Sequence, residues 1–157
     1  MRQERRMRIN RFVLDTNIWI SYFITQNQQK LIDIIANNDL IVFSCKELFE
    51  EFTRVLDYPH LKKFEVNIAK AKEIIKGASV LFELHYPIKR YIPDDEDDDY
   101  LIALALQTSS GFITSGDTHI LSEKSSLERK YQKLRIITKA EFENMFIKNI
   151  KENLKFH

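Results

Sequence analysis

Six consecutive acidic residues, Asp94–Asp99, stand directly before an apolar, helix-like stretch in this sequence. The segment reads "DDEDDDYLIALALQT", and a lone aspartate, Asp117, follows it in a glycine-containing turn. Close carboxylates repel one another and raise each other's pKa unless a cation lies among them. A hard divalent cation such as Mg²⁺ or Mn²⁺ binds through a few carboxylates, waters and substrate phosphate. The acidic run is therefore a candidate part of a metal site.

A structural role explains only part of this run. Helix N-termini favour aspartate as a cap and as a complement to the helix dipole, an effect worth about 0.3–1 kcal/mol per residue. Capping accounts for one or two carboxylates, and the run holds six. We expect Asp94, Glu96 and Asp99 to face solvent.

Two further aspartates follow apolar segments that read as buried strands. Asp15 ends "RFVLD", where an isolated carboxylate would be costly to bury. Asp117 follows "GFIT" by a short turn, in "TSGDTH". Each could serve only as a cap for the helix that comes next. The two positions are equally suited to binding a cation.

Glu51 is separated from its acidic neighbours by helical geometry. At about 100° per residue, the helix predicted over 44–56 places four apolar residues on one stripe: Leu48, Phe52, Val55 and Leu56. Glu50 falls opposite this stripe, and Glu47 is expected to form a capping box with Ser44. Glu51 borders the stripe, so its carboxylate is expected to be half-buried. It needs either a basic partner or a metal ion.

The elements that must position these acids alternate along the chain. Short apolar segments typical of buried strands occupy residues 11–15, 40–43, 79–84, 111–114 and 134–138. Helical patterns separate them, and continuously apolar strands that alternate with helices indicate a parallel sheet covered on both faces. We therefore predict an α/β fold, a three-layer α/β/α arrangement around a mainly parallel sheet of these five strands. In such sheets, strand C-termini and helix N-termini share one edge, so Asp15, Glu51, Asp97–Asp99 and Asp117 should gather there.

Length and composition favour one domain spanning residues 1–157. Residues 1–8 form a basic N-terminal extension and residues 139–157 a C-terminal helix in this interpretation. The sequence has no apolar run of the roughly 18–20 residues that span a bilayer, and we expect a cytoplasmic protein without a membrane partner. A single cysteine, Cys45, excludes an internal disulfide framework and a multi-cysteine zinc site.

Four blocks, taken in order, resemble the PIN-domain family, most closely its bacterial toxin-like branch of ribonucleases. They are "FVLDTNIWIS", "SCKELFEEFTRVL", "DDEDDDYLIALAL" and "FITSGDTHIL", and the resemblance covers roughly residues 8–145. It implies a single PIN-like domain with an acidic pocket for Mg²⁺ or Mn²⁺. It also implies endonucleolytic cleavage of single-stranded RNA, often by the toxin of a toxin–antitoxin pair, and family members often form homodimers.

Matched position by position, the resemblance assigns the catalytic acids to Asp15, Glu51, Asp98 and Asp117. Asp15, Asp98 and Asp117 would hold metal directly or through water. Glu51 would position or help to deprotonate the attacking water.

Supporting residues are assigned in the same way to Asn17, Ser21 and Ser115. The sequence departs from the family pattern at two positions. Glu96 replaces the usual proline, which leaves Asp97 as a competitor of Asp98 for the third acid. His119 stands where many members have another aspartate. It is either a surface residue or a softer ligand that shifts metal preference towards Mn²⁺.

Other classes of protein fit the sequence less well. Phosphatases that form an aspartyl-phosphate need a second aspartate two residues after the first, and Asn17 stands there. Receiver domains need a lysine at the end of a late strand, whereas Lys139 comes only after the last one. The remaining alternative is a catalytically inactive PIN-like module that binds protein, for example an antitoxin.

Overall fold

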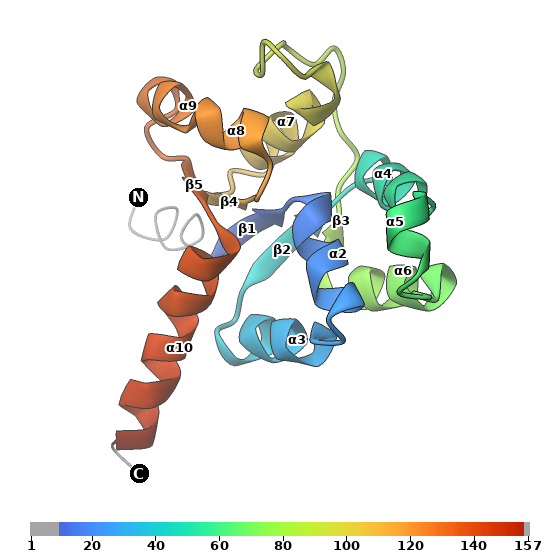
Figure 1. Cartoon of the computed structure of the whole chain (residues 1–157). Helices are drawn as coiled ribbons and strands as arrows, with labels where there is room; N and C mark the ends of the chain where they lie inside the picture. Colours follow the sequence, from blue (N-terminus) through green and yellow to red (C-terminus); the bar gives the residue numbers. More distant parts are fainter. Residues whose placement is uncertain (1–9, 156–157) are drawn as a thin grey trace.

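Five parallel strands form the centre of the molecule, in the order β3-β2-β1-β4-β5 (Figure 1). The computed structural model describes the backbone of residues 10–155 and the side chains of residues 10–147, so the predicted basic extension at 1–8 lies outside the described residues. The strands are β1 (Arg11–Leu14), β2 (Ile41–Ser44), β3 (Val80–Leu81), β4 (Phe112–Thr114) and β5 (Arg135–Ile137). The predicted α/β class with a five-stranded parallel sheet is confirmed.

Helices connect the strands and cover the sheet. They are α2 (Thr16–Ile24), α3 (Gln28–Asn37), α4 (Lys46–Leu56), α5 (Pro59–Lys62), α6 (Ile68–Ala78), α7 (Asp99–Gln107), α8 (Thr118–Ser122), α9 (Lys124–Lys130) and α10 (Lys139–Lys155). A short 3₁₀ helix, η1 (Glu96–Asp98), leads into α7. In Figure 1, α7, α8 and α9 lie on one side of the sheet, and α2, α3 and α6 lie on the other. The result is the predicted three-layer arrangement.

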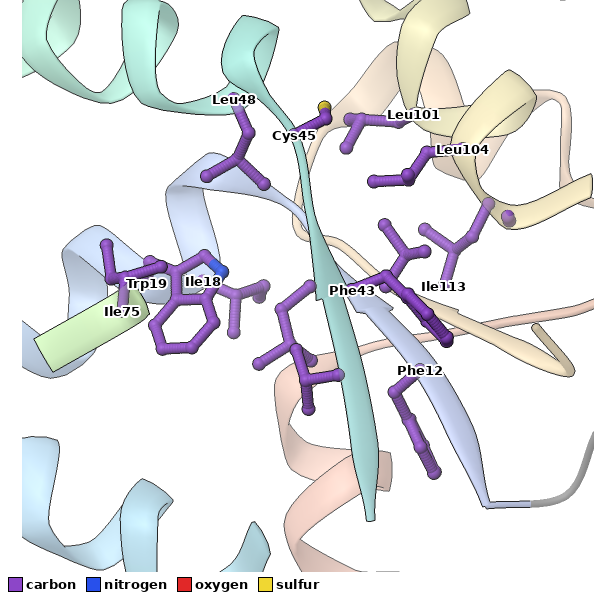
Figure 2. Close-up of a cluster of buried hydrophobic side chains, with 14 of the residues drawn as sticks. Phe12, Ile18, Trp19, Phe43, Cys45, Leu48, Ile75, Leu101, Leu104 and Ile113 are labelled. Atoms are coloured by element: carbon purple, nitrogen blue, oxygen red, sulfur yellow. The ribbon is translucent and has the colours of Figure 1, made fainter. Parts of the chain in front are cut away.

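The middle strand β1 is the most deeply buried part of the sheet. Phe12, Val13 and Leu14 are all fully buried, because β1 has a strand on each side and helices on both faces. Figure 2 shows Leu101 and Leu104 of α7 on one side of the sheet and Trp19 of α2 on the other. Such burial fixes the position of whatever follows Leu14, and the next residue is Asp15.

The two neighbours of β1 make its C-terminal end a crevice. The chain leaves β1 for β2 on one side and later returns through α7 to β4 on the other. Where the strand order reverses in this way, the connecting helices diverge and a site forms beyond the strand ends. The C-terminal helix α10 begins after β5, and its Phe142 and Phe146 pack edge-on against the ring of Phe12.

Two local predictions were wrong. The third strand covers only Val80 and Leu81 and not residues 79–84, because Leu84 turns into the core and the backbone of His85 bonds to the side chain of Gln107. The capping box also does not form. Strand β2 continues through Ser44, whose hydroxyl lies 2.8 Å from that of Ser79, so α4 starts only at Lys46 and Glu47 instead accepts a hydrogen bond from Tyr86.

No helix within residues 10–155 combines the length and the hydrophobicity that crossing a membrane requires.

Candidate metal centre

Asp15 is the most deeply placed acid at the C-terminal edge of the sheet. It follows β1, is only 2% exposed, and its backbone N–H donates to Thr114 of β4. The Ser115 hydroxyl donates to its Oδ2 at 2.6 Å. Burial raises the pKa of Asp15 to about 7; the Ser115 hydrogen bond opposes this shift, and the nearby charge of Glu51 adds to it.

Asp98 lies at the junction of η1 and α7 and is 6% exposed. Its Oδ2 is buried and has no hydrogen-bond partner among the described residues. Burial raises its pKa to about 9, and the charges of Asp117, Asp15 and Asp95 push in the same direction. A carboxylate in this position is poorly stabilised as an anion unless a cation joins it.

Asp117 follows β4 and caps helix α8. Its Oδ1 accepts from the backbone N–H groups of His119 at 2.8 Å and Ile120 at 3.2 Å. The Ser115 hydroxyl ties this turn to Asp15, because it donates to Asp15 and accepts from the Asp117 N–H at 3.0 Å. The cap that the sequence suggested is therefore real, and it holds the carboxylate beside the other acids.

Glu51 occupies the half-buried position on α4 that the helical stripe predicted. Its pKa is raised, mainly by burial, while the hydroxyls of Thr16 and Tyr100 lower it. These two hydroxyls lie 3.1 Å apart, so α2 and α7 meet beside Glu51. The carboxylate is thus placed next to Asp15 but keeps contact with solvent.

The tightest cluster of potential ligands includes one acid that sequence reasoning missed. One ligand atom from each of Asp95, Asp98, Asp117 and His119 lies within 4.8 Å of all the others. Asp95 also caps η1, since its Oδ1 accepts from the Asp97 N–H. The signal was its position three residues before Asp98, which a 3₁₀ turn brings to the same side. Such a turn cannot be recognised within a run of like charges.

His119 joins this cluster from α8. Its Nδ1 lies 3.3 Å from Asp95 and 3.9 Å from Asp117, and the side chain is half exposed. The structure thus brings the loop before α7, which carries Asp95, close to the turn after β4, which leads into His119.

The remaining acids of the run have different surroundings. Asp97 is exposed, unlike Asp98. Asp94 and Glu96 face solvent, as expected. The prediction for Asp99 was wrong: it is 5% exposed, because its Oδ1 accepts from the N–H groups of Tyr91 and Ile92, both at 2.8 Å, and its Oδ2 pairs with Arg90.

The three predicted supporting residues make different contacts. Asn17 donates weakly to Asp15 at 3.4 Å, and its carbonyl oxygen accepts from the Gly116 N–H at 3.3 Å, so it bridges the turns after β1 and β4. Ser115 connects Asp15 and Asp117 as described above. The Ser21 hydroxyl donates to the carbonyl of Ile18 in its own helix.

These donors suit a divalent cation. Carboxylate oxygens are the ligands that Mg²⁺ and Mn²⁺ prefer, and one imidazole is acceptable to Mn²⁺. The unpartnered Oδ2 of Asp98 supplies a buried acceptor that a cation would satisfy. The acidic cluster can therefore hold a metal ion.

A family model for the PIN domain matches residues 11–119, well over half of the chain. The chain belongs to the PIN-domain family, and the resemblance noted from its four sequence blocks is confirmed at this level. PIN domains are generally metal-dependent nucleases. No curated protein matches the sequence.

Proposed function

We propose that this protein is a metal-dependent endoribonuclease that hydrolyses phosphodiester bonds of single-stranded RNA. The observation that carries the proposal is the buried carboxylate of Asp98: its Oδ2 has no hydrogen-bond partner among the described residues, and the nearby charges of Asp117 and Asp15 raise its pKa. Repulsion among these groups destabilises the pocket without a cation. A bound divalent cation would relieve this repulsion.

The proposal assigns metal binding to the acidic residues of the site. Asp15, Asp98 and Asp117 would hold Mg²⁺ or Mn²⁺, with Asp95 and His119 at the solvent side. A bound divalent cation would lower the pKa of a coordinated water and stabilise charge on the phosphate.

Glu51 would orient the attacking water and accept its proton. Its raised pKa makes its carboxylate a stronger base than an ordinary glutamate, and its charge acts on Asp15, so its position suits a general base. Ser115 and Asn17 would keep the Asp15 and Asp117 turns together. Tyr100 and Thr16 would hold Glu51 in place.

RNA is the proposed substrate on the strength of the family resemblance. We further propose that the protein acts in the cytoplasm as the toxin of a toxin–antitoxin pair, with an antitoxin protein as its partner.

The test is cleavage of end-labelled single-stranded RNA with Mg²⁺, with Mn²⁺ and with EDTA. Asp15→Asn removes a ligand, and Asp94→Asn is the matched control, because Asp94 is an exposed acid at the start of the same run. Metal-dependent cutting that Asp15→Asn abolishes and Asp94→Asn retains would support the proposal. Cutting that survives EDTA and Asp15→Asn would refute it.

Absence of cutting would need a second measurement, the melting temperature with and without Mn²⁺. A rise in the wild type that Asp15→Asn removes would keep the metal site but reject general cleavage of single-stranded RNA. No rise would favour the inactive, protein-binding module.

A further inference from the structure

The connection between helices α4 and α6 carries two aromatic side chains on the surface of the protein. Among the described side chains, three phenylalanine, tyrosine or tryptophan residues are exposed, and two of them flank the short helix α5: Tyr58 at 43% and Phe64 at 41%. The ring of His60 lies 6.1 Å from the ring of Tyr58, and Lys63 Nζ lies 5.2 Å from the centre of the Phe64 ring. Aromatic rings interleaved with basic side chains are typical of surfaces that bind single-stranded nucleic acid.

Tyr58 lies on the same side of α4 as Glu51, the residue to which we assign the proton transfer. Its backbone N–H donates to the carbonyl of Val55 at 3.0 Å, so the last turn of α4 continues as far as Tyr58. Seven residues separate it from Glu51, which at about 100° per residue is within about 20° of two full turns. The distance along the helix axis is about 10 Å. A strand bound at the proposed active site can therefore reach Tyr58 within a few nucleotides.

Glu51 has opposite charges on its two flanks. Its pKa is raised mainly by burial; the charge of Arg54 opposes this shift, and the charge of Asp97 adds to it. The loop that carries Asp97 also exposes Asp94 and Glu96, so it repels a phosphate backbone. Arg54 is exposed, one turn of α4 beyond Glu51 in the direction of Tyr58. Of these two flanks, a polyanion is favoured only on the side of Arg54.

The positive charge continues from Arg54 into α5, which packs beside the end of α4 (Figure 1). Between Glu51 and Glu65 the chain has three basic residues and one acid: Arg54, Lys62, Lys63 and Asp57. The acid pairs with Lys62 at 3.2 Å. Arg54 and Lys63 form no ion pair at 4 Å or less with any described residue, so both cations remain available to phosphates.

We propose that Arg54, Tyr58 and Lys63 form a subsite that binds single-stranded RNA beyond the scissile phosphate, along the C-terminal half of α4. Tyr58 stacks on an unpaired base, and Arg54 contacts the backbone between that base and the pocket. The faces of bases in a duplex are covered by their neighbours, so a duplex cannot use Tyr58. The subsite thus selects single strands. This inference rests on the proposed function, because it assigns part of the substrate of the same site.

The experiment is binding of a short, fluorescently labelled single-stranded RNA to the full chain in EDTA, where metal-dependent cleavage is prevented. Fluorescence anisotropy measures the dissociation constant. Tyr58→Ala should raise it at least about fivefold, because a stacked base is lost. Tyr58→Phe keeps the ring and should bind like the wild type. The same RNA in a duplex should bind more weakly, and Tyr58→Ala should not change its affinity.

Tyr86→Ala is the matched control for the direction of the strand. Tyr86 is a more exposed tyrosine (65%), and its hydroxyl donates to Glu47 in the first turn of α4, at the opposite end of the helix. This variant should leave the dissociation constant unchanged.

A second pair of variants tests the backbone contact. Arg54→Gln should weaken binding and lower the slope of log affinity against log salt by about one. Lys46→Gln removes an exposed lysine from the first turn of α4 and should leave the slope unchanged. Melting temperatures show that all variants fold.

The outcomes separate the subsite from the nuclease activity. Wild type that does not bind RNA in EDTA, or Tyr58→Ala that binds as tightly as the wild type, would overturn the subsite. An equal loss of affinity in Tyr86→Ala would overturn the direction along α4. Metal-dependent cleavage without any effect of Tyr58→Ala would refute the subsite alone. Binding that depends on Tyr58, in a protein that cuts no RNA with Mg²⁺ or Mn²⁺, would refute the proposed catalysis alone.

Discussion

Asp98 and Asp99 are neighbours in the chain and almost equally hidden from solvent, at 6% and 5% exposure, but their carboxylates meet opposite surroundings. Asp99 points towards the loop before the acidic run, where two backbone N–H groups and the Arg90 guanidinium satisfy it. Asp98 lies near Asp117 and Asp15, whose charges raise its pKa, and its Oδ2 has no hydrogen-bond partner within residues 10–147. The two side chains are consecutive at the junction of η1 and α7, so the helical rotation between neighbouring residues directs them to different surroundings.

The comparison separates a structural from a functional use of buried charge. A buried carboxylate is tolerable when hydrogen bonds and a cationic side chain satisfy it. Asp99 meets this condition within the protein, and so it fastens residues 90–92 to the start of α7. For Asp98, the described residues provide no such hydrogen bond to Oδ2, so its charge would be left unsatisfied. Asp99 holds the loop, and Asp98 would hold the proposed metal.

The largest expected effect is on cleavage. Asp98→Asn should reduce metal-dependent RNA cleavage at least about 100-fold, because the loss of a charged ligand weakens both metal binding and stabilisation of the phosphate. It should also remove the rise in melting temperature on adding Mn²⁺. Single-turnover cleavage and thermal unfolding measure the two effects. Asp98→Asn that cuts like the wild type would place the metal site elsewhere.

A smaller effect, on stability, is expected at the neighbouring residue. Asp99→Asn should lower the free energy of unfolding by about 1–3 kcal/mol, because an amide pairs less well with two N–H donors and leaves Arg90 without its buried anion. Thermal unfolding in EDTA measures this loss. The increment in melting temperature on adding Mn²⁺ should persist. If Asp99→Asn also abolished that increment, the division of labour between the two residues would be wrong.

The pH dependence of the metal-free protein's stability should have a definite sign. The folded-state pKa values of Asp15 (about 7) and Asp98 (about 9) lie above their ordinary value of 3.8. The folded state therefore holds protons that the unfolded state has released, and stability falls as pH rises from about 4 through these values. Between pH 5 and pH 8, we expect the metal-free protein in EDTA to lose stability progressively, as measured by denaturant unfolding.

Asp98→Asn provides the control for this pH dependence. The variant should lose less stability than the wild type over the same interval, because one of the two titrating carboxylates is gone. Saturating Mn²⁺ should weaken or reverse the trend in the wild type, since a cation favours the charged forms. An identical pH profile in wild type and variant would show that Asp98 does not hold a proton in the folded protein.

The sequence was informative where regular periodicity or topology decides position. Asp15 and Asp117 follow strands of a parallel sheet, so the fold brings them together, and Glu51 could be separated from Glu50 because helix geometry distinguishes their faces. Asp95 was missed and the prediction for Asp99 was wrong, because neither periodicity nor topology decides which side chains turn inwards in an irregular loop. Six like charges give no pattern, and which of them turn inwards depends on η1 and on N–H groups seven and eight residues away.

The predictions of the length of β3 and of the start of α4 failed for a related reason. Residues 79–84 are apolar enough for a longer strand, but the pairing ends where Leu84 turns inwards and Gln107 bonds to the backbone of His85. Ser44 has the right spacing from Glu47 for a capping box but remains in β2. In both cases a tertiary contact overrides a plausible local signal.

The smallest expected effect concerns His119, at the solvent side of the cluster. An imidazole is a better ligand for Mn²⁺ than for Mg²⁺, whereas a carboxylate serves both. His119→Asp should therefore raise the affinity for Mg²⁺ and lower the ratio of Mn²⁺ affinity to Mg²⁺ affinity. The ratio should change by only about a few-fold, because the side chain is half exposed. Calorimetric titration of each metal measures the ratio, with Thr118→Asp as a control that adds the same charge one residue away. An unchanged ratio in His119→Asp would make His119 a surface residue. Its proximity to Asp95 would then have no part in metal choice, and the pocket would select its cation through Asp98 and the inner acids alone.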